Sequence, residues 1–231
     1  MQIDYSKARY LFDGVTLEEL NEEMAKAIRS FLTVENIYAS AIREITTKLE
    51  NLNDEFKVTM DRNPIHQIKA RVKTPKSIAE KLIRKGYELS IQSAKENLND
   101  IAGVRVICSY IDDIYMIEEF LTSQEDIKLL KRTDYIQNPK PNGYRSLHLV
   151  VAVPVSLYKS RENVKVEIQI RTIAMDFWAS LEHDLAYKLP EGKKEGIVRE
   201  LKDCADVIAQ VDMRMQKLYK MITNGQALKK E

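Results

Sequence analysis

Residues 164–171, VKVEIQIR, alternate without interruption between apolar and polar side chains. Such alternation predicts a β-strand with one face in a core, because successive side chains along a strand point to opposite faces. The apolar face carries Val164, Val166, Ile168 and Ile170, and the polar face carries Lys165, Glu167, Gln169 and Arg171. The pattern therefore predicts a sheet with one face buried in a hydrophobic core. The charged side is either a solvated surface or the wall of a site.

A second alternating segment, residues 68–73 (IKARVK), predicts another strand with a cationic face. Its apolar side chains are Ile68, Ala70 and Val72, and its cationic ones are Lys69, Arg71 and Lys73. A helix is expected next, at 77–85, with Pro75 just ahead of it and Gly86 as its C-terminal stop.

Positive charge is concentrated in this strand and helix. The segment carries Arg71, Lys73, Lys76, Lys81, Arg84 and Lys85, together with Ser77. Helical spacing puts Ser77, Lys81 and Arg84 on one face, beside the cationic face of the strand. Several cations and a hydroxyl near a helix N-terminus can hold a triphosphate through charge-assisted hydrogen bonds. A solvated basic helix is the alternative.

The remaining periodicity predicts one mixed sheet flanked by helices. We expect a helical hairpin at 16–57, strands at 104–111, 127–132 and 146–155, and helices at 111–121, at 173–188 and, after a break at Gly192, up to Asn224. The fold class is therefore α/β (α+β). A single domain spans residues 1–231, with N-terminal helices at 1–60, a core at 65–188, a C-terminal helix at 192–224 and a frayed tail at 224–231.

Composition narrows the function classes. With 36 basic and 35 acidic residues, the chain has no global field that would attract nucleic acid or a membrane. Cys108 and Cys204 lie far apart without a second pair at metal-ligand spacing, which argues against a disulfide framework and a zinc site. No apolar run is long enough for a signal peptide or a membrane span. We expect a soluble cytoplasmic protein.

The segment NDIAGVRVICSY presents an acid just before a strand. Asp100 lies in the turn that leads into the strand, where a carboxylate can hold Mg²⁺ together with phosphate oxygens. The alternative is a carboxylate that caps a turn or helix. Gly103 permits a close backbone approach or marks a simple turn, and Arg105 lies on the face opposite Val104 and Val106.

The loop NPKPNGYRSLH combines a turn signal with polar and aromatic side chains. Asn142 and Gly143 predict a tight turn, and Tyr144 presented on it can stack on a purine while its neighbours bind phosphate. A hairpin with an exposed aromatic side chain is the alternative. For His148, a structural role in its strand is the alternative to a role in binding.

Four motifs in order, DIAGVRV, PNGYRSLH, VEIQIRT and MDFWASLEHDLAYK, resemble the synthetase domain of the RelA/SpoT family. The resemblance covers residues 65–188 and is to the stand-alone members, the small alarmone synthetases that make (p)ppGpp. It implies a five-stranded mixed sheet surrounded by helices, similar to the nucleotidyltransferases, in a homotetramer. It also implies transfer of the β,γ-pyrophosphate of ATP to the 3′-hydroxyl of GTP or GDP.

The resemblance also implies roles for individual residues. ATP would be bound by Arg71, Lys73, Ser77, Lys81 and Arg84, with its adenine between the planes of Arg71 and Arg105. The acceptor nucleotide would be bound by Lys140, Asn142, Tyr144, Arg145, His148 and Gln169, with guanine stacked on Tyr144. Asp100 and Glu167 would hold Mg²⁺, and Glu167 would be the candidate base for the 3′-hydroxyl. GTP, GDP and GMP are not separated by these residues.

The sequence departs from relatives at several positions. Some relatives have an arginine where this chain has Thr133, and strand alternation turns the neighbouring Arg132 to the other face. Relatives activated by their product have Phe and Thr where this chain has Gln67 and Lys69, so such activation is not expected. The hydrolase and ribosome-binding domains of longer relatives are not expected either. The His183-Asp184 pair does not replace the hydrolase motif, and Trp178 and Leu181 are expected to be packing residues.

Two other functions fit parts of this pattern. A nucleotidyltransferase with the same fold would transfer AMP and release pyrophosphate. A non-catalytic RNA-binding module would use the basic segment between Arg71 and Arg84, with strongly salt-dependent affinity. Asp100 and Glu167 argue against RNA as the main ligand, because carboxylates repel phosphate unless a metal lies between them. RNA is therefore expected at most as a regulator.

Overall fold

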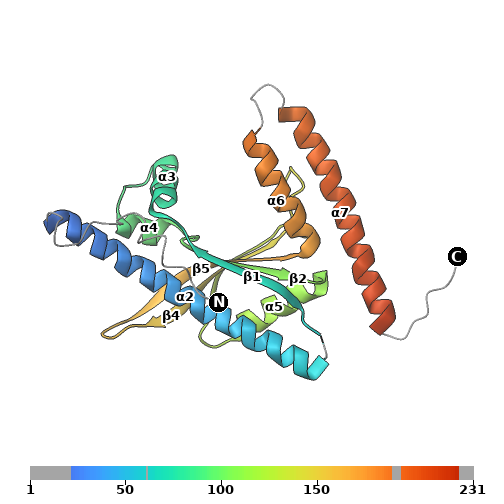
Figure 1. The fold of residues 1–231 in the computed structure, drawn as a ribbon, viewed down its shortest axis with the longest axis horizontal. Helices are drawn as coiled ribbons and strands as arrows, with labels where there is room; N and C mark the ends of the chain where they lie inside the picture. Colours follow the sequence, from blue (N-terminus) through green and yellow to red (C-terminus); the bar gives the residue numbers. More distant parts are fainter. Residues whose placement is uncertain (1–21, 61, 189–193, 224–231) are drawn as a thin grey trace, which may run out of the picture.

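The computed structural model describes residues 22–60, 62–188 and 194–223. Its five-stranded sheet has the order β1-β2-β5-β4-β3 (Figure 1). The strands are β1 (Ile65–Val72), β2 (Ala102–Cys108), β3 (Lys128–Asp134), β4 (Leu147–Ser156) and β5 (Arg161–Thr172). β2 and β5 are parallel, whereas the other neighbouring pairs are antiparallel. The sheet is therefore mixed, as the sequence predicts.

Helices pack against both faces of this sheet. α2 (Glu22–Met60) crosses one face and contacts β1, β2, β4 and β5, and α5 (Ile111–Ser123) contacts β2 and β5 (Figure 1). α6 (Ile173–Lys188) follows β5 directly and contacts β2, β5 and α7 (Lys194–Thr223). α3 (Pro75–Lys85) and α4 (Ile91–Asn97) lie between β1 and β2 in the sequence.

The core lies between the sheet and α2. Val164, Val166, Ile168 and Ile170 of β5 are each at most 4% exposed, which confirms the apolar face predicted from the alternation. The side chains of Ile42, Ile45 and Leu49 from α2 belong to the same core and are at most 2% exposed. Burial of this apolar surface is the main favourable term in folding. It frees the opposite face of the sheet for polar residues.

Local sequence signals determine both ends of α3. Thr74 is the N-cap, with its hydroxyl accepting a hydrogen bond from the Ser77 backbone N–H, and Pro75 occupies the first turn. Gly86 ends the helix with φ 71°, a left-handed conformation, and its N–H donates to the Ile83 carbonyl at 3.0 Å. The helix begins earlier than predicted, because Pro75 is inside the helix rather than ahead of it.

The N-terminal hairpin is a wrong prediction for the part of the chain that the structure describes. One helix runs continuously from Glu22 to Met60, and its sequence contains no glycine or proline that would interrupt it. The short helix α4 was not predicted. Residues 1–21, the break at Gly192 and the tail 224–231 lie outside the described residues.

Candidate active site

Two rows of side chains cross the polar face of the sheet. Strand register aligns Lys69, Arg105, Gln169, His148 and Thr133 in one row. The neighbouring row contains Arg71, Gly103, Glu167, Val150 and Lys131. Residues that are far apart in the sequence therefore lie side by side on adjacent strands. Arg71 and Arg105 are diagonal neighbours, with Gly103 opposite Arg71 and Lys69 opposite Arg105.

Asp100 lies where the chain enters β2 and is held by two lysines. Its Oδ2 accepts hydrogen bonds from Lys73 Nζ and from Lys81 Nζ, the latter at 2.6 Å. Its other oxygen, Oδ1, is buried and has no hydrogen-bond partner among the described residues. Burial acts to raise the pKa of Asp100, but the two lysines outweigh it and the pKa is lowered. The carboxylate is therefore ionised at neutral pH, and one of its two oxygens has no partner among the described residues.

Glu167 occupies the centre of the polar face on β5. Gln169 Nε2 donates to its Oε2 at 3.0 Å, and His148 Nδ1 lies 3.7 Å from its Oε1. Burial and the negative charge of Asp100 raise the pKa of Glu167, whereas His148 and Gln169 lower it, and the net shift is downward. The negative charges of Asp100 and Glu167 therefore influence each other at the polar face of the sheet.

Asp100 and Glu167 line two cavities. The first, which we call the donor cavity, has a volume of about 660 Å³ and is also lined by Lys69, Arg71, Lys73, Arg105 and Gln169. The second, which we call the small cavity, has a volume of about 170 Å³ and is also lined by Lys81, Lys85, Lys131, Thr133 and His148. Both cavities are rich in cations, and both carboxylates contribute to each of them.

Gly103 leaves space on the floor of the donor cavity. It faces the cavity between Arg71 and Glu167, and the nearest atom to an added Cβ would be the Arg71 carbonyl oxygen at 3.9 Å. Its φ is outside the left-handed region, so a side chain is sterically tolerated by the backbone. A larger residue would instead fill space that a ligand could occupy.

The loop before β4 is fixed by contacts with α6 and α7. Gly143 has φ 90°, and a Cβ on it would lie 2.5 Å from the Ala205 Cβ of α7, so only glycine fits there. Asn142 donates to Glu182 of α6 at 3.1 Å and accepts from the Tyr144 backbone N–H at 3.2 Å. The predicted turn is present, and its glycine is needed for both conformation and packing.

Tyr144 extends from this loop into the polar face. Its hydroxyl oxygen lies 2.8 Å from His148 Nε2 and accepts a hydrogen bond of 2.8 Å from Arg171. Lys140 Nζ lies 4.7 Å from the ring centres of both Tyr135 and Tyr144. Tyr144 also lines the donor cavity. The loop therefore brings an aromatic ring and a cation to the edge of the site.

Other predicted binding residues point elsewhere. Arg145 pairs with Asp206 of α7 at 3.0 Å and donates to the Gly143 carbonyl, so it fastens the loop to α7. The Ser77 hydroxyl lies 3.0 Å from Thr74 Oγ1 at the start of α3, and Arg84 is exposed. Neither the donor cavity nor the small cavity is lined by Ser77, Arg84, Lys140, Asn142 or Arg145.

Thr133 and Arg132 point to opposite faces of β3, as strand alternation predicts. Thr133 lines the small cavity, whereas Arg132 pairs with Glu118 of α5 at 2.5 and 3.0 Å. Arg132 also donates to Asp134 at 3.2 Å. Its guanidinium is therefore used on the side of the sheet that carries α5.

Comparison with known proteins decides the family. The family model described as the region found in RelA / SpoT proteins matches residues 70–192. GTP pyrophosphokinase YwaC of Bacillus subtilis is 47% identical over 186 residues, which cover 80% of this chain and 89% of that protein. The chain belongs to the RelA/SpoT family. Its matched region extends from β1 through α6 and contains both Asp100 and Glu167.

Solved structures of small alarmone synthetases have the same fold. Small alarmone synthetase 1 of B. subtilis bound to its product pppGpp superposes with a TM-score of 0.76 at 33% identity, covering 84% of this chain and 98% of that one. Small alarmone synthetase 2 of the same organism has a TM-score of 0.74 at 45% identity, covering 82% and 98%. These likenesses confirm the five-stranded mixed sheet with its helices and the similarity to small alarmone synthetases.

The carboxylates of Asp100 and Glu167, which line both cavities, fit one hard cation. Among the described residues, no group of three or more histidine, cysteine, aspartate or glutamate side chains could hold a metal. Asp100 and Glu167 are two, which matches Mg²⁺, because this ion uses one or two carboxylates and keeps other positions for water and phosphate oxygens. The buried Oδ1 of Asp100 without a partner is the atom such an ion would satisfy.

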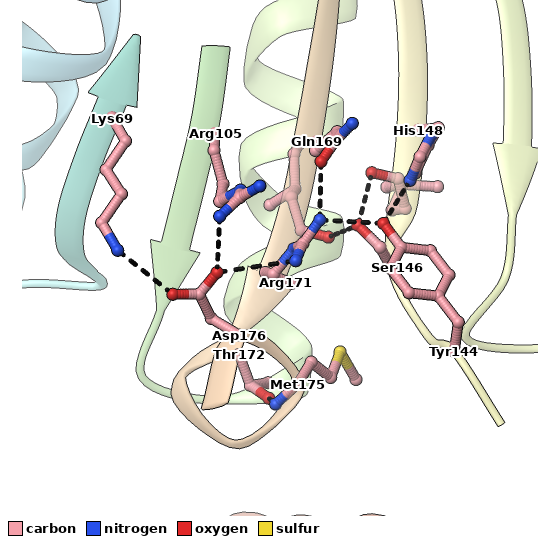
Figure 2. A network of polar contacts seen from close by, with 12 residues as sticks. Lys69, Arg105, Tyr144, Ser146, His148, Gln169, Arg171, Thr172, Met175 and Asp176 are labelled. Atoms are coloured by element: carbon pink, nitrogen blue, oxygen red, sulfur yellow. Dashed lines mark hydrogen bonds and ion pairs between the residues drawn. The ribbon is translucent and has the colours of Figure 1, made fainter. Parts of the chain in front are cut away.

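Asp176 contacts the polar face although the sequence pattern does not indicate it. This residue of α6 accepts contacts from Lys69, Arg105 and Arg171, which all belong to the polar face of the sheet (Figure 2). Arg171 had been assigned to that face without a partner. An acid in the first turn of the helix after β5 was the available signal, since it follows Arg171 closely in sequence.

Within the described residues, no helix has the length and apolar character to cross a membrane.

Proposed function

We propose that this protein is a (p)ppGpp synthetase, a GTP pyrophosphokinase that transfers the β,γ-pyrophosphate of ATP to the 3′-hydroxyl of GTP or GDP and releases AMP. The observation that carries the proposal is the pair of ionised carboxylates, Asp100 and Glu167, at the junction of two cationic cavities. The names of the relatives support it, since YwaC and YjbM of B. subtilis are GTP pyrophosphokinases with 47% and 36% identity.

ATP occupies the donor cavity in this proposal. Arg71 and Arg105 are diagonal neighbours on adjacent strands, so their guanidinium planes can hold an adenine ring between them. Lys73 and Lys81 already converge on Asp100 and would neutralise the phosphates next to it. Ser77 and Arg84 on α3 would contact only phosphate oxygens that extend beyond the cavity.

Asp100 and Glu167 would hold Mg²⁺ between them. When bound, the ion draws negative charge off the β- and γ-phosphates and so stabilises the transition state of phosphoryl transfer. The lowered pKa of each carboxyl keeps it ionised at neutral pH, as a metal ligand must be. The same shift makes Glu167 a weaker base than an ordinary glutamate. We therefore assign Glu167 first to the metal and second to the proton of the 3′-hydroxyl.

The acceptor nucleotide approaches from the Tyr144 side. Its guanine stacks on the Tyr144 ring, whose hydroxyl is anchored by His148 and Arg171. Lys140 lies close enough to contribute charge to the acceptor phosphates, and Gln169 supports Glu167. Asn142 and Arg145 act on the acceptor indirectly, because their contacts with α6 and α7 fix the loop that carries Tyr144.

We also propose a single-domain cytoplasmic enzyme that assembles as a homotetramer. Apolar side chains recur on the outer side of α7 at Val207, Val211, Met215 and Ile222, each at least 51% exposed. Such a stripe is suited to cover by another subunit. Light scattering at several protein concentrations measures the assembly directly. A molar mass near that of one chain would contradict this part of the proposal.

The direct test is a separation of nucleotides after reaction. Purified protein is incubated with Mg²⁺, ATP and either GDP or GTP, and the products are resolved by anion-exchange chromatography. The proposal predicts AMP together with a guanosine nucleotide that carries two additional phosphates. Formation of ADP would indicate a simple kinase, and free pyrophosphate would indicate a nucleotidyltransferase. Either result without AMP contradicts the proposal.

A further inference from the structure

Asp176 is the meeting point of three cations. It lies in the first turn of α6 and is 8% exposed. Its Oδ1 is 3.2 Å from Arg105 Nη1 and 3.5 Å from Arg171 Nη1, and its Oδ2 is 3.3 Å from Lys69 Nζ (Figure 2). Each of these cations comes from a different strand, β1, β2 or β5. One carboxylate therefore joins three strands at the edge of the donor cavity.

Arg171 continues the network to the acceptor side. Its side chain is 2% exposed, and its Nη2 donates to Gln169 Oε1 at 2.6 Å and to the Tyr144 hydroxyl at 2.8 Å. The same hydroxyl contacts His148 (Figure 2). The Nδ1 of His148 lies 3.7 Å from Glu167 Oε1. Burial lowers the pKa of Arg171, and the negative charge of Asp176 acts against that shift.

The attachment of α6 has contacts other than those of the Asp176 carboxylate. Thr172 caps the start of the helix by accepting from the Met175 N–H at 3.1 Å, and Trp178 donates to the Leu201 carbonyl of α7 at 2.9 Å. Met175 and Trp178 are buried on the same helix. Within the described residues, the recorded contacts of the Asp176 carboxylate are all with cations of the polar sheet face. The Asp176 carboxylate therefore contacts the candidate active site.

We propose that Asp176 is a positioning residue for both substrates: it fixes Arg105 for the donor nucleotide and, through Arg171, fixes Tyr144 for the acceptor. This inference rests on the proposed synthetase function. Three cations close together repel one another unless an anion lies between them. Removal of that anion would let Arg105 turn toward solvent and would weaken the hold of Arg171 on Tyr144.

The first test is Asp176→Asn, which keeps the shape and an acceptor oxygen but removes the charge. We expect KM to rise for both ATP and the guanosine acceptor and overall kcat/KM to fall about 100-fold, because a displacement of about 1 Å in a positioning group has that effect. Glu119→Gln on α5 is the matched control, an exposed carboxylate-to-amide change on the other face of the sheet. It should leave both KM values and kcat unchanged.

The second test separates positioning from simple loss of structure. Tyr144→Phe removes only the hydroxyl that Arg171 holds, so it should raise the acceptor KM in the unaltered protein. In the Asp176→Asn background the same change should have little further effect, because the link through Arg171 is already weakened. Independent effects that multiply would overturn the proposal. Asp176→Glu, which retains the charge, should recover most of the lost activity.

Thermal unfolding shows whether Asp176→Asn is folded at the assay temperature. If it is not, a cycle of Arg105→Lys and Tyr144→Phe makes the test, since no hydrogen bond joins these two described residues and each contacts one member of the Asp176–Arg171 pair. If the fold-losses in activity of the two single variants do not multiply in the double variant, the proposal is supported; if they multiply, it is overturned.

An unaltered protein without synthetase activity would contradict the proposed function. An active protein whose Asp176→Asn variant is folded and unaffected would contradict only this inference.

Discussion

The two faces of the sheet are made from the same strands and differ in almost every physical property. On β5 the core-facing Val166 and Ile168 are completely buried beneath helices, whereas their neighbour Glu167 opens into both cavities. The core face gains its free energy from apolar burial. The other face holds charges whose positions are determined by hydrogen bonds and ion pairs. Alternate residues of one strand therefore serve stability and chemistry separately.

The polar face is itself divided into an open part and a closed part. Glu167 and Arg105 are half-buried where they line the donor cavity, whereas Arg171, four residues after Glu167 on the same face of β5, lines the same cavity but is only 2% exposed. The next residue, Thr172, has the parity of the core-facing Ile170 and donates to the buried Asp212 of α7 at 2.6 Å. The face thus changes from a ligand site to a polar interior within one strand. Substitutions at the open part should change kcat and KM, whereas substitutions at the closed part should change the free energy of unfolding.

The largest effect should come from Glu167→Gln. We expect kcat to fall by about 1,000-fold, the loss that follows removal of one group that stabilises charge in a transition state. The free energy of unfolding should fall by only about 1 kcal/mol, because the amide retains the size of the side chain but loses the contact with His148. Steady-state product formation and urea unfolding measure the two quantities. A variant that unfolds at a much lower urea concentration would show that the polar face also carries stability, which contradicts the comparison of the two faces.

Ile168→Ala, one residue further along, should have the opposite character. Ile168 is completely buried in the core, so we expect a loss of about 2 to 5 kcal/mol in the free energy of unfolding. At a temperature where the variant is folded, its kcat and KM should match those of the unaltered protein. Chemical denaturation followed by circular dichroism gives the first value. Unchanged stability would show that the core face is packed differently.

Gly103→Ala tests whether the open part of the polar face is a binding floor. The added methyl group has room in the protein, since the nearest atom is 3.9 Å away, but it extends into the donor cavity beside Arg71 and Glu167. We expect the KM for ATP to rise about tenfold, as for one misplaced methyl group in a binding pocket, with stability retained. An unchanged ATP KM would place the nucleotide elsewhere.

Asp212→Asn tests the buried polar contact at the end of β5 and should have the smallest effect. Burial raises the pKa of Asp212, although the hydrogen bond from Thr172 opposes it. An acid whose folded pKa is raised stabilises the protein below its ordinary pKa of 3.8, and that contribution is lost as pH rises through the folded value. At pH 7 the amide should therefore stabilise the protein, by up to about 1 kcal/mol.

The benefit of Asp212→Asn should shrink as pH falls from neutrality toward the raised pKa. Urea unfolding at pH 7 and at successively lower pH values measures the trend. Kinetic constants should not change, because Asp212 lines neither the donor cavity nor the small cavity. A gain that is constant with pH would mean that Asp212 carries no ionisation penalty in the folded protein.

The sequence predicted the features that depend on neighbours in the chain. The period of two fixed both faces of β5, and Gly86 ended α3 as expected, because these signals act over a few residues. Prediction failed where the partner is distant. Nothing near Arg145 indicates Asp206, and nothing near Lys69 indicates Asp176, more than one hundred residues away. The prediction of an N-terminal hairpin was wrong for a local reason, since the segment between its two expected helices contains no helix-breaking residue.

The central claim is that Asp100 and Glu167 act as one unit although they lie on different segments. Turnover is compared for Asp100→Asn, Glu167→Gln and the variant with both changes, with AMP release as the readout. The account predicts that each single change removes most of the activity and that the double variant is no slower than the slower single variant, as for residues that act together. Losses that multiply, or a single variant with the turnover of the unaltered protein, would contradict it.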